Sequence, residues 1–282
     1  VIEHATKTDY SKYGIRKDNE YVVKGEAGSP YAIKDYYDID PDLAEDPSTR
    51  MQEFEALVTR THEVGLKVVL DFVPNHVARQ YHSDTAPEGV DDLGAHDNKE
   101  MHFSPSNNFY YIPRQAFTPQ FYIGEGVDRY FEYPAKATGN DCFGAFPGEY
   151  DWYETVKLNY GVDYTGGGRC HFDPIPDTWY KMLDILLFWC GKGVDAFRCD
   201  MAHMVPVEFW NWAISKVKEN YPSVIFIAEI YDQALYRVYI EKGKFDYLYD
   251  KVGLYDKLRG VLCHQVSAAQ LTYCWQSVDG IG

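Results

Sequence analysis

The sequence of 282 residues contains no Cys-x-x-Cys pair among its six cysteines and no apolar run of 18 residues. The first absence argues against a zinc or dithiol redox motif, and the second argues against a membrane-spanning helix. Basic residues are also scarce: 27 lysines and arginines stand against 43 acidic residues, for a net charge of −16. This charge balance argues against nucleic acid or an anionic membrane as a partner and suits a neutral polar substrate.

Aromatic side chains, in contrast, are abundant, with 25 tyrosines and 6 tryptophans. Aromatic faces pack against sugar rings, but they also anchor cores and loops. With 45% hydrophobic and 25% charged residues, the composition is that of an ordinary soluble protein. The length is enough for one large α/β domain or two small ones. Composition alone therefore leaves the function open.

Three apolar stretches, each typical of a buried parallel strand, end in polar side chains. They are GLKVVLDFVPNH (65–76) with Asp71, Asn75 and His76, GVDAFRCDMA (193–202) with Arg198 and Asp200, and VIFIAEI (224–230) with Glu229. A parallel α/β barrel builds its active site at the C-terminal edge of its strands. The alternative is that Arg198 and Asp200 merely brace a strand end, although burying two charges is costly.

The remaining chain predicts alternating helices and strands after a long polar loop over residues 1 to about 46. Apolar residues at helical spacing predict one helix from Asp46 to Gly65, with Leu57 and Val64 on its apolar face. Further helices are expected after Asp177, which would cap the first of them, and after Pro206. FDYLYD, residues 245–250, predicts a fourth strand, and a helical stretch follows it.

About 130 residues separate Asp71 from Asp200, whereas one βα unit takes about 30. Residues 77 to about 172 therefore predict an inserted, irregular subdomain, whose many aromatic residues argue against disorder. Four strands fall short of the eight that close a barrel. The predicted fold is thus an α/β, (β/α)8 TIM-barrel type that is incomplete in this chain. Its expected parts are 1–76 and 173–282 from the barrel and 77–172 as the insertion.

Two carboxylates on neighbouring strands, with an arginine beside one of them, are the minimum set for retaining glycoside cleavage. Arg198 is expected to keep Asp200 ionised by lowering its pKa, so that Asp200 can attack the anomeric carbon. Glu229 has mostly apolar neighbours in the sequence, which would raise its pKa and keep it protonated as the acid. The residues alone leave a proton-abstracting or metal-dependent barrel enzyme open as the alternative.

The sequence resembles the α-amylase family, glycoside hydrolase family 13, in five motifs that follow the family's order. They are SPYAIKDYY, DFVPNH, KLNY, AFRCD and AEI, which lie between about Ser29 and Asp250. The resemblance implies an α-amylase-like retaining hydrolase of α-1,4-glucans such as starch or maltooligosaccharides. A transglycosylase, a sucrose- or trehalose-active relative and a non-catalytic carbohydrate-binding protein are the alternatives. The implied partner is an oligosaccharide or polysaccharide, and the oligomeric state is open.

The resemblance also implies roles for individual residues. Asp200 would be the nucleophile and Glu229 the general acid/base, with Arg198 beside the nucleophile. Four further residues would contact the sugar: Tyr31 by stacking on the ring, Asp71, His76 and, on the leaving-group side, His203. The family's third catalytic acid follows a histidine, but His264 is the only histidine after Glu229 and precedes a glutamine. That aspartate is therefore expected beyond Gly282.

A second departure concerns calcium. Many members of the family have a calcium-binding aspartate where this chain has Lys157, and Asn75 lies in a position that often supports the ion. An ammonium group repels calcium and cannot ligate it. No cofactor or metal ligand is therefore assigned, calcium is disfavoured, and the Lys157 ammonium is expected to replace the cation near Asn75.

Overall fold

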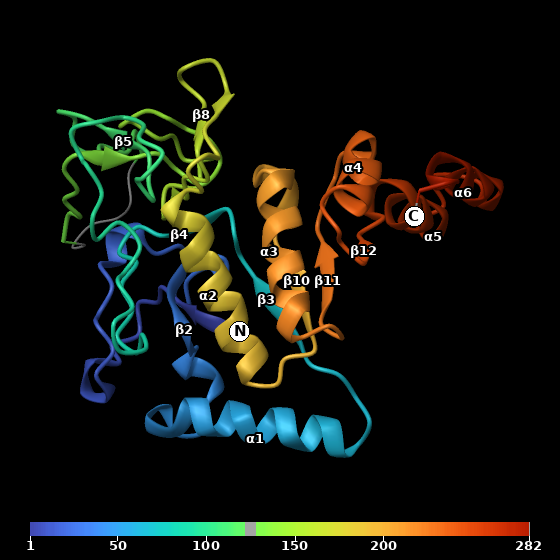
Figure 1. Cartoon of the computed structure of the whole chain (residues 1–282), viewed down its shortest axis with the longest axis horizontal. Coiled ribbons are helices and arrows are strands. Elements are labelled where there is room, and N and C mark those ends of the chain that lie inside the picture. The colour runs from blue at the N-terminus through green and yellow to red at the C-terminus, as the bar shows by residue number, and fades with distance from the viewer. Residues whose placement is uncertain (122–127, 282) are drawn as a thin grey trace. The chain divides into compact units, whose positions relative to one another are not determined.

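The computed structural model describes residues 1–121 and 128–281, and its contacts divide the chain into two compact units (Figure 1). The first unit comprises Val1–Val68 and Val73–Gly193, and the second comprises Val69–Phe72 and Val194–Gly282. The first unit contains residues from all three parts expected from the sequence, and the expected boundaries at 76 and 172 stay a prediction. In the described ranges no helix has the length and apolar character needed to cross a membrane.

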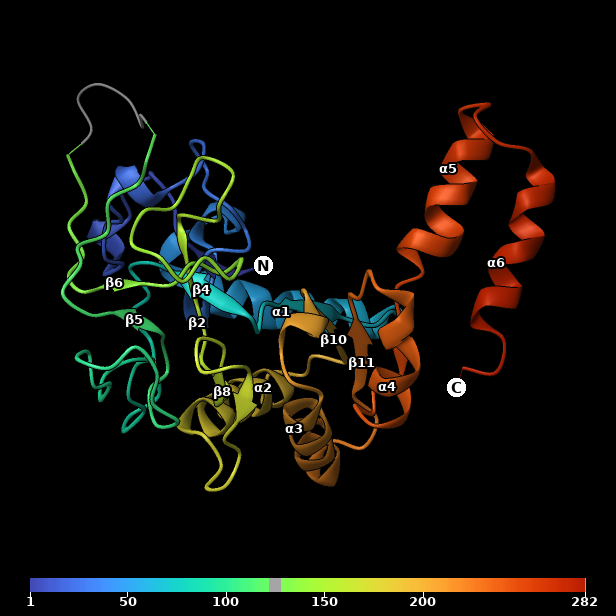
Figure 2. The ribbon, with the colours of Figure 1, turned by 90° about the horizontal axis from the view of Figure 1, so that it is seen from above.

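A four-stranded parallel sheet lies at the centre of the second unit (Figures 1 and 2). In spatial order its strands are β12 (Tyr247–Leu248), β11 (Ile225–Ala228), β10 (Ala196–Cys199) and β3 (Val69–Phe72). Strand β10 pairs with β3 and β11 without a register shift, which places Arg198 opposite Asp71. The four parallel strands predicted from the sequence are confirmed, and each is shorter than the apolar stretch that predicted it.

Helices follow the strands of this unit, and the first two of those named here bury several apolar or aromatic side chains, whereas the last two bury only Gly260 and Cys274. They are α3 (Val207–Asn220), α4 (Tyr236–Glu241), α5 (Asp256–Leu262) and α6 (Leu271–Val278). Helix α3 begins directly after Pro206 and buries Trp210 completely. The indole N–H of Trp210 donates to the carbonyl of Ala202 at 3.0 Å, and its ring packs against Phe72 and Phe245. Trp210 therefore joins α3 to the sheet and to the turn that follows β10.

Two long helices belong to the first unit, α1 (Arg50–Glu63) and α2 (Asp177–Gly191). Both were expected, but the buried stripe of α1 is narrower than predicted. Leu57 and Val64 are exposed, because the stripe repeats every four residues and consists of Arg50, Phe54 and Val58. The ring of Phe54 packs edge-on against Trp189 of α2 at 5.4 Å. Helix α2 has Pro176 as its N-cap residue, so the prediction that Asp177 caps it is wrong.

The expectation of a loop over residues 1–46 is also wrong, because two antiparallel strands form there. These are β1 (Ile2–His4) and β2 (Ile33–Ile39). All seven residues of β2 are buried, including Lys34, Asp35 and Asp38. A strand with charged side chains on both faces shows no apolar alternation, so the pattern that identifies strands is missing.

The segment after β3 folds into short antiparallel pairs within the first unit. They are β4 (His76–Ala78) with β7 (Thr155–Lys157), β5 (Tyr111–Ile112) with β6 (Ala135–Lys136), and β8 (Val162–Asp163) with β9 (Arg169–Cys170). Tyr110, Ile112 and Phe117 of this segment pack with Val22 in one buried cluster. Its aromatic residues therefore form a core.

Short helical turns complete both units. The 3₁₀ turns are Ser11–Tyr13, Glu20–Val22, Pro41–Leu43, Pro47–Thr49, Ala202–Met204, Gln233–Leu235 and Ala268–Gln270, and Lys251–Tyr255 is a π turn.

Two tryptophans of the second unit make a matched test of this packing. We expect Trp210→Phe to lower the free energy of unfolding by about 2 kcal/mol, because it removes the indole donor, so that the Ala202 carbonyl keeps only the Val205 N–H at 3.3 Å, and because it opens space in a full core. Trp275→Phe, at a side chain that is 72% exposed, should change it by less than about 0.5 kcal/mol. Urea unfolding of both variants measures the difference, and equal effects would contradict the packing described.

Candidate active site

The guanidinium of Arg198 lies at the centre of the candidate site and contacts three carboxylates. Nη1 donates to Asp71 at 3.0 and 3.2 Å and to Asp200 Oδ1 at 2.8 Å. Nη2 lies 2.7 Å from Glu229 Oε1, and Nε donates to the hydroxyl of Tyr249 at 3.2 Å. The three carboxylates hold the pKa of Arg198 above its usual value although burial by itself lowers it. One permanent positive charge thus gathers three acidic side chains.

The parallel strands explain why these side chains meet. Asp71 and Arg198 are directly paired residues of β3 and β10, Asp200 follows the end of β10, and Glu229 follows the end of β11. The carboxyl ends of parallel strands share one edge of a sheet, which is where barrel enzymes place their catalytic groups. The structure therefore brings together four of the seven residues that the sequence singled out.

The backbone after β10 is turned toward this cluster by one unusual residue. Met201 has φ 45° and ψ 41°, the left-handed conformation that costs a non-glycine residue about 1–2 kcal/mol. In this conformation the Met201 N–H donates to Glu229 Oε2 at 3.0 Å. Backbone strain at functional sites is typically retained where it positions a group. Here it positions a donor against the carboxylate of Glu229.

The expected lowering of the pKa of Asp200 is wrong for the free protein. Burial, followed by the negative charge of Glu229, raises the pKa of Asp200 to about 7, and the Arg198 guanidinium lowers it only in part. The side chains of Asp200 and Glu229 hydrogen-bond to each other, so they behave as one pair. The sequence argument counted the arginine beside Asp200 but not the second carboxylate that the neighbouring strand delivers.

The expected rise in the pKa of Glu229 is wrong as well. Burial alone raises it, but the hydroxyl of Tyr231, the N–H of Met201 and the charge of Arg198 outweigh burial, and the net pKa of Glu229 is lowered. The Tyr231 hydroxyl donates to Glu229 Oε1 at 2.5 Å. The apolar residues beside Glu229 in the sequence do not determine its surroundings, because its polar contacts come from Tyr231, two residues further along, from the turn at Met201 and from Arg198 on the neighbouring strand.

Sequence reasoning missed two tyrosines of the site, Tyr231 and Tyr249. Tyr231 lies two residues after Glu229, and Tyr249 directly follows β12, whose Leu248 pairs with Ala228 of β11. The available signal was position: both tyrosines follow strand ends at the edge that carries Glu229. In a chain with 25 tyrosines that signal did not separate them from the others.

His203, expected on the leaving-group side, lies in the turn Ala202–Met204 of the second unit. Its ring stands 6.3 Å from that of Tyr231 in an edge-on arrangement. Its Nδ1 atom is buried, and within the part of the chain that the structure describes it has no hydrogen-bond partner. His203 is thus associated with Tyr231.

Tyr31 and His76, the two remaining predicted sugar contacts, belong to the first unit. The Tyr31 side chain is 41% exposed, whereas His76 is only 2% exposed. His76 packs against Trp152 with ring centroids 5.1 Å apart and hydrogen-bonds to the backbone of Tyr31. Burial, followed by the nearby Lys157 ammonium, lowers the pKa of His76 to about 3, so the imidazole is neutral.

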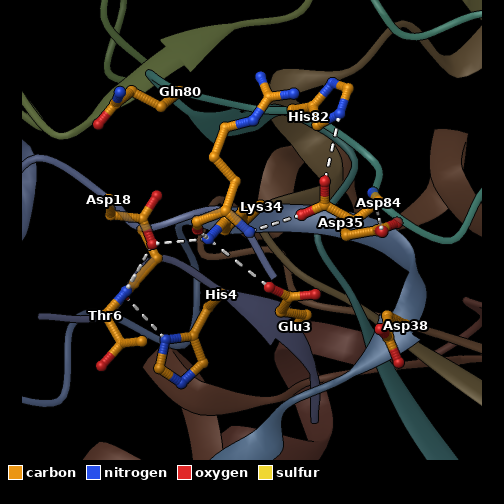
Figure 3. Close-up of polar contacts among 12 residues, drawn as sticks. Glu3, His4, Thr6, Asp18, Lys34, Asp35, Asp38, Gln80, His82 and Asp84 are labelled. Carbon is orange, nitrogen blue, oxygen red and sulfur yellow. Dashed lines mark hydrogen bonds and ion pairs between the residues drawn. The ribbon is translucent and has the colours of Figure 1, made fainter. Parts of the chain in front are cut away.

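Among the described residues, one trio of acidic side chains has carboxylate oxygens that all lie within 4.8 Å of one another: Glu3, Asp35 and Asp38 (Figure 3). Protein cations and donors already engage it. Asp35 accepts hydrogen bonds on both oxygens, Arg50 Nε donates to Asp38 at 2.9 Å, and Lys34 Nζ lies 3.8 Å from Glu3 Oε1. Burial raises the pKa of Glu3 to about 9, which makes it a neutral acid at pH 7. The trio therefore does not suit a divalent ion.

A side-chain cation also occupies the position at which the resemblance of the sequence would place calcium. Lys157 Nζ lies 2.7 Å from Asn75 Oδ1 and 2.6 Å from Asp141 Oδ1. Calcium needs six to eight oxygen ligands, and an ammonium group at this spot supplies none and repels the ion. The residues present do not fit calcium, and no chemistry is assigned to it.

Parts of the chain are similar to known proteins. Residues 22–126 match the sequence model of the alpha amylase catalytic domain. The alpha-1,4-glucan:maltose-1-phosphate maltosyltransferase of Cereibacter sphaeroides is 36% identical over 107 residues, which cover 36% of this chain and 18% of that protein. The enzyme of the same name from Rhodospirillum rubrum is 28% identical over 212 residues, which cover 72% of this chain and 22% of that protein. The chain spans about a fifth of the length of these relatives.

Solved structures show the fold. An alpha-amylase from Lactobacillus plantarum superposes with a TM-score of 0.57 at 22% identity, over 99% of this chain and 50% of that one. The cyclic alpha-maltosyl-(1→6)-maltose hydrolase from Arthrobacter globiformis superposes with a TM-score of 0.58 at 18% identity, over 91% and 47%. The fold is thus of the (β/α)8 barrel type, and the described residues contribute a parallel sheet rather than a closed barrel.

The carboxylate pair predicts an unusual dependence of stability on pH. Asp200 keeps its proton up to about pH 7 in the folded state but loses it near pH 3.8 when unfolded. The higher affinity of the folded state for this proton therefore adds its full share to the free energy of unfolding below about pH 4. That share is lost as the pH rises through 7. We expect Asp200→Asn to be more stable than the wild type by about 2 kcal/mol at pH 8, with a smaller difference at pH 5.

Urea unfolding at both pH values measures this difference. Asp256→Asn, at an exposed carboxylate of the same unit, is the control and should show no such gain. If Asp200→Asn destabilises the protein at pH 8, the folded state does not raise the pKa of Asp200.

Proposed function

Because the chain belongs to the α-amylase family, we propose that its protein cleaves α-1,4-glucosidic bonds with retention of configuration and transfers the glycosyl group to an acceptor. The observation that carries the proposal is the contact of Arg198 with Asp71, Asp200 and Glu229 at one edge of a parallel sheet. Two neighbouring carboxyl groups are what retaining glycoside cleavage requires, and Arg198 holds Asp200 and Glu229 together.

In the proposed reaction Asp200 attacks the anomeric carbon while Glu229 protonates the departing glycosidic oxygen. The free pair hydrogen-bonds directly, whereas retaining glycosidases hold their carboxyl groups about 5 Å apart. A bound sugar must therefore separate the two groups and leave the shared proton on Glu229. In the second step Glu229 acts as the base, and the donors from Tyr231 and Met201 stabilise that carboxylate.

Tyr31, Asp71, His76 and His203 remain proposed sugar contacts. The half-exposed ring of Tyr31 suits stacking on a sugar face. Asp71 keeps 37% of its side chain exposed while bound to Arg198, which leaves it able to accept from a sugar hydroxyl.

The names of the curated relatives support transfer as the outcome, since they are called maltosyltransferases of an α-1,4-glucan. Hydrolysis, the outcome expected from the sequence motifs, is the second candidate. It is favoured by the names of the solved neighbours, but at 22% identity or less these support the fold alone. Both outcomes share the glycosyl-Asp200 intermediate and differ in whether water or a sugar accepts the glycosyl group.

Product analysis distinguishes the two candidates. The protein is incubated with α-maltose 1-phosphate and maltohexaose, and phosphate, free maltose and chain length are followed by ion chromatography. Longer glucans with release of phosphate support transfer, whereas maltose in equal amount to phosphate supports hydrolysis. Absence of turnover with this donor and with maltoheptaose alone would contradict the proposal for this chain.

The acid role of Glu229 can be tested with a donor that needs no acid. We expect Glu229→Gln to lose about 10²- to 10⁴-fold in kcat/KM on maltooligosaccharides, because the leaving oxygen must be protonated. With α-maltosyl fluoride the loss in forming the glycosyl-enzyme should be far smaller, since fluoride leaves as an anion. Rapid-quench mass spectrometry measures the intermediate.

Asp200→Asn should abolish the intermediate from both donors, and Glu241→Gln, at an exposed carboxylate of the same unit, should change neither rate. Equal losses of Glu229→Gln on the two donors would argue against Glu229 as the acid.

The hydrogen bond from Tyr231 to Glu229 predicts how the pH profile of kcat/KM responds to a change of Tyr231. Its hydroxyl lowers the pKa of Glu229, so Tyr231→Phe should raise that pKa and move the alkaline limb of kcat/KM upward by about 0.5–1 pH unit. Tyr273→Phe, at an exposed tyrosine, serves as the control. An unchanged alkaline limb in Tyr231→Phe would mean that Tyr231 does not act on the acid.

A further inference from the structure

Lys157 is a fully enclosed cation in the first unit. Its side chain is 2% exposed and lies on β7, directly opposite His76 of β4 in the strand register. The ammonium contacts Asn75 Oδ1 at 2.7 Å and Asp141 Oδ1 at 2.6 Å, and it lies 5.3 Å from the centre of the Tyr164 ring. A buried charge is costly unless it is paired and hydrogen-bonded, and these contacts supply both conditions.

The ammonium determines how the amide of Asn75 is oriented. An ammonium group can only donate, so the atom of Asn75 that faces Lys157 must be the oxygen. The amide nitrogen then faces the other way, where it donates to the carbonyl of Gly139 at 2.7 Å and lies 3.1 Å from Nδ1 of His76. All polar atoms of the Asn75 side chain are thereby engaged.

The orientation of Asn75 in turn assigns the tautomer of His76. Because Asn75 Nδ2 is a donor, Nδ1 of His76 must accept, and the imidazole proton lies on Nε2. This agrees with the hydrogen bond that the His76 ring makes to the backbone of Tyr31. A series of contacts thus runs from Asp141 through Lys157, Asn75 and His76 to the loop of Tyr31.

The surrounding backbone leaves little freedom for any member of the series. A Cβ atom on Gly139 would lie 2.8 Å from Cβ of His76 and 2.6 Å from Oγ1 of Thr155, so only glycine fits there. The N–H of Leu158 donates to the carbonyl of Asn75 at 3.0 Å and ties β7 to the residue before β4. Orientation is therefore imposed by packing as well as by hydrogen bonds.

We infer that the Lys157 ammonium is a structural cation built into the polypeptide, which makes this site independent of divalent ions and positions His76 with its proton on Nε2. Lys157 is a positioning residue, because it acts through Asn75. The use of His76 against a sugar rests on the proposed function, whereas the role of the ammonium does not.

Calcium dependence tests the first half of the inference without any assay of activity. Thermal melting of the wild type should be the same in 1 mM CaCl₂ and in EDTA. Lys157→Asp, which adds a carboxylate to the oxygens of Asn75 and Asp141, should melt lower in EDTA and gain about 5 °C with CaCl₂. Lys157→Met should melt lower than the wild type in both buffers.

Lys99→Asp makes the same change of charge at an exposed position of the same unit and should show no response to calcium. Stabilisation of the wild type by CaCl₂ would overturn the inference, as would a Lys157→Met variant that is as stable as the wild type. If Lys157→Asp fails to fold, the wild-type and Lys157→Met measurements still decide the question.

Nitrogen NMR of the imidazole tests the second half. The wild-type His76 should show an unprotonated Nδ1 and a protonated Nε2. Asn75→Asp keeps a partner for the ammonium but removes the donor to Nδ1, so the proton of His76 should move to Nδ1, which can then donate to the new carboxylate. An unchanged tautomer in Asn75→Asp, or an Nδ1–H tautomer in the wild type, would overturn the positioning role. Neither result depends on turnover, so failure of this inference is distinguishable from failure of the proposed function.

Discussion

The interaction on which the candidate site depends is the binding of three carboxylates by one guanidinium. Asp71, Asp200 and Glu229 come from three different strands, and without Arg198 their mutual repulsion would oppose the pairing of β3, β10 and β11 at that edge. The planar fork of an arginine contacts several oxygens at fixed angles, which a lysine does not do. The group on which the proposed function depends is therefore also the group that holds these three strand ends together.

In the first unit, too, buried side-chain cations contact several oxygen atoms, but there the cations are ammonium groups. Lys34 lies among Glu3 and Asp18, and Lys157 lies between Asn75 and Asp141 (Figure 3 shows the former). In both places a side-chain cation, attached to a buried strand, balances oxygen atoms that would otherwise be enclosed without a partner. Such an arrangement specifies the register of the strand that carries the lysine, because a shift of one residue would bring the charge to the opposite face.

The sequence predicted the features that show as a change from apolar to polar residues along the chain. It missed the features that arise from contacts between segments far apart in the chain. Arg198, Asp200 and Glu229 stood out because polar residues ended apolar strands, and the parallel sheet followed from the same pattern. Strand β2 was missed because its buried lysine and aspartates remove the apolar alternation. The predicted pKa direction of Asp200 was wrong because burial and the carboxylate of Glu229, on a neighbouring strand, outweigh Arg198. The predicted direction for Glu229 was wrong because Tyr231, the turn at Met201 and Arg198 outweigh its burial. Tyr231 and Tyr249 had no contrast with the many other tyrosines.

The count of charges around Arg198 has a consequence for recognition. Three acidic groups surround one guanidinium, so the cluster keeps a net negative charge at neutral pH even when Asp200 holds a proton. The sugar ring in glycoside cleavage passes through a state with positive, oxocarbenium-like character. Under the proposed function, a partly buried negative cluster discriminates by charge as well as by shape, and it stabilises a ring that has become cationic more than it stabilises the neutral sugar. The same electrostatics favour protonated amines of sugar-like shape over uncharged analogues as ligands of this edge of the sheet.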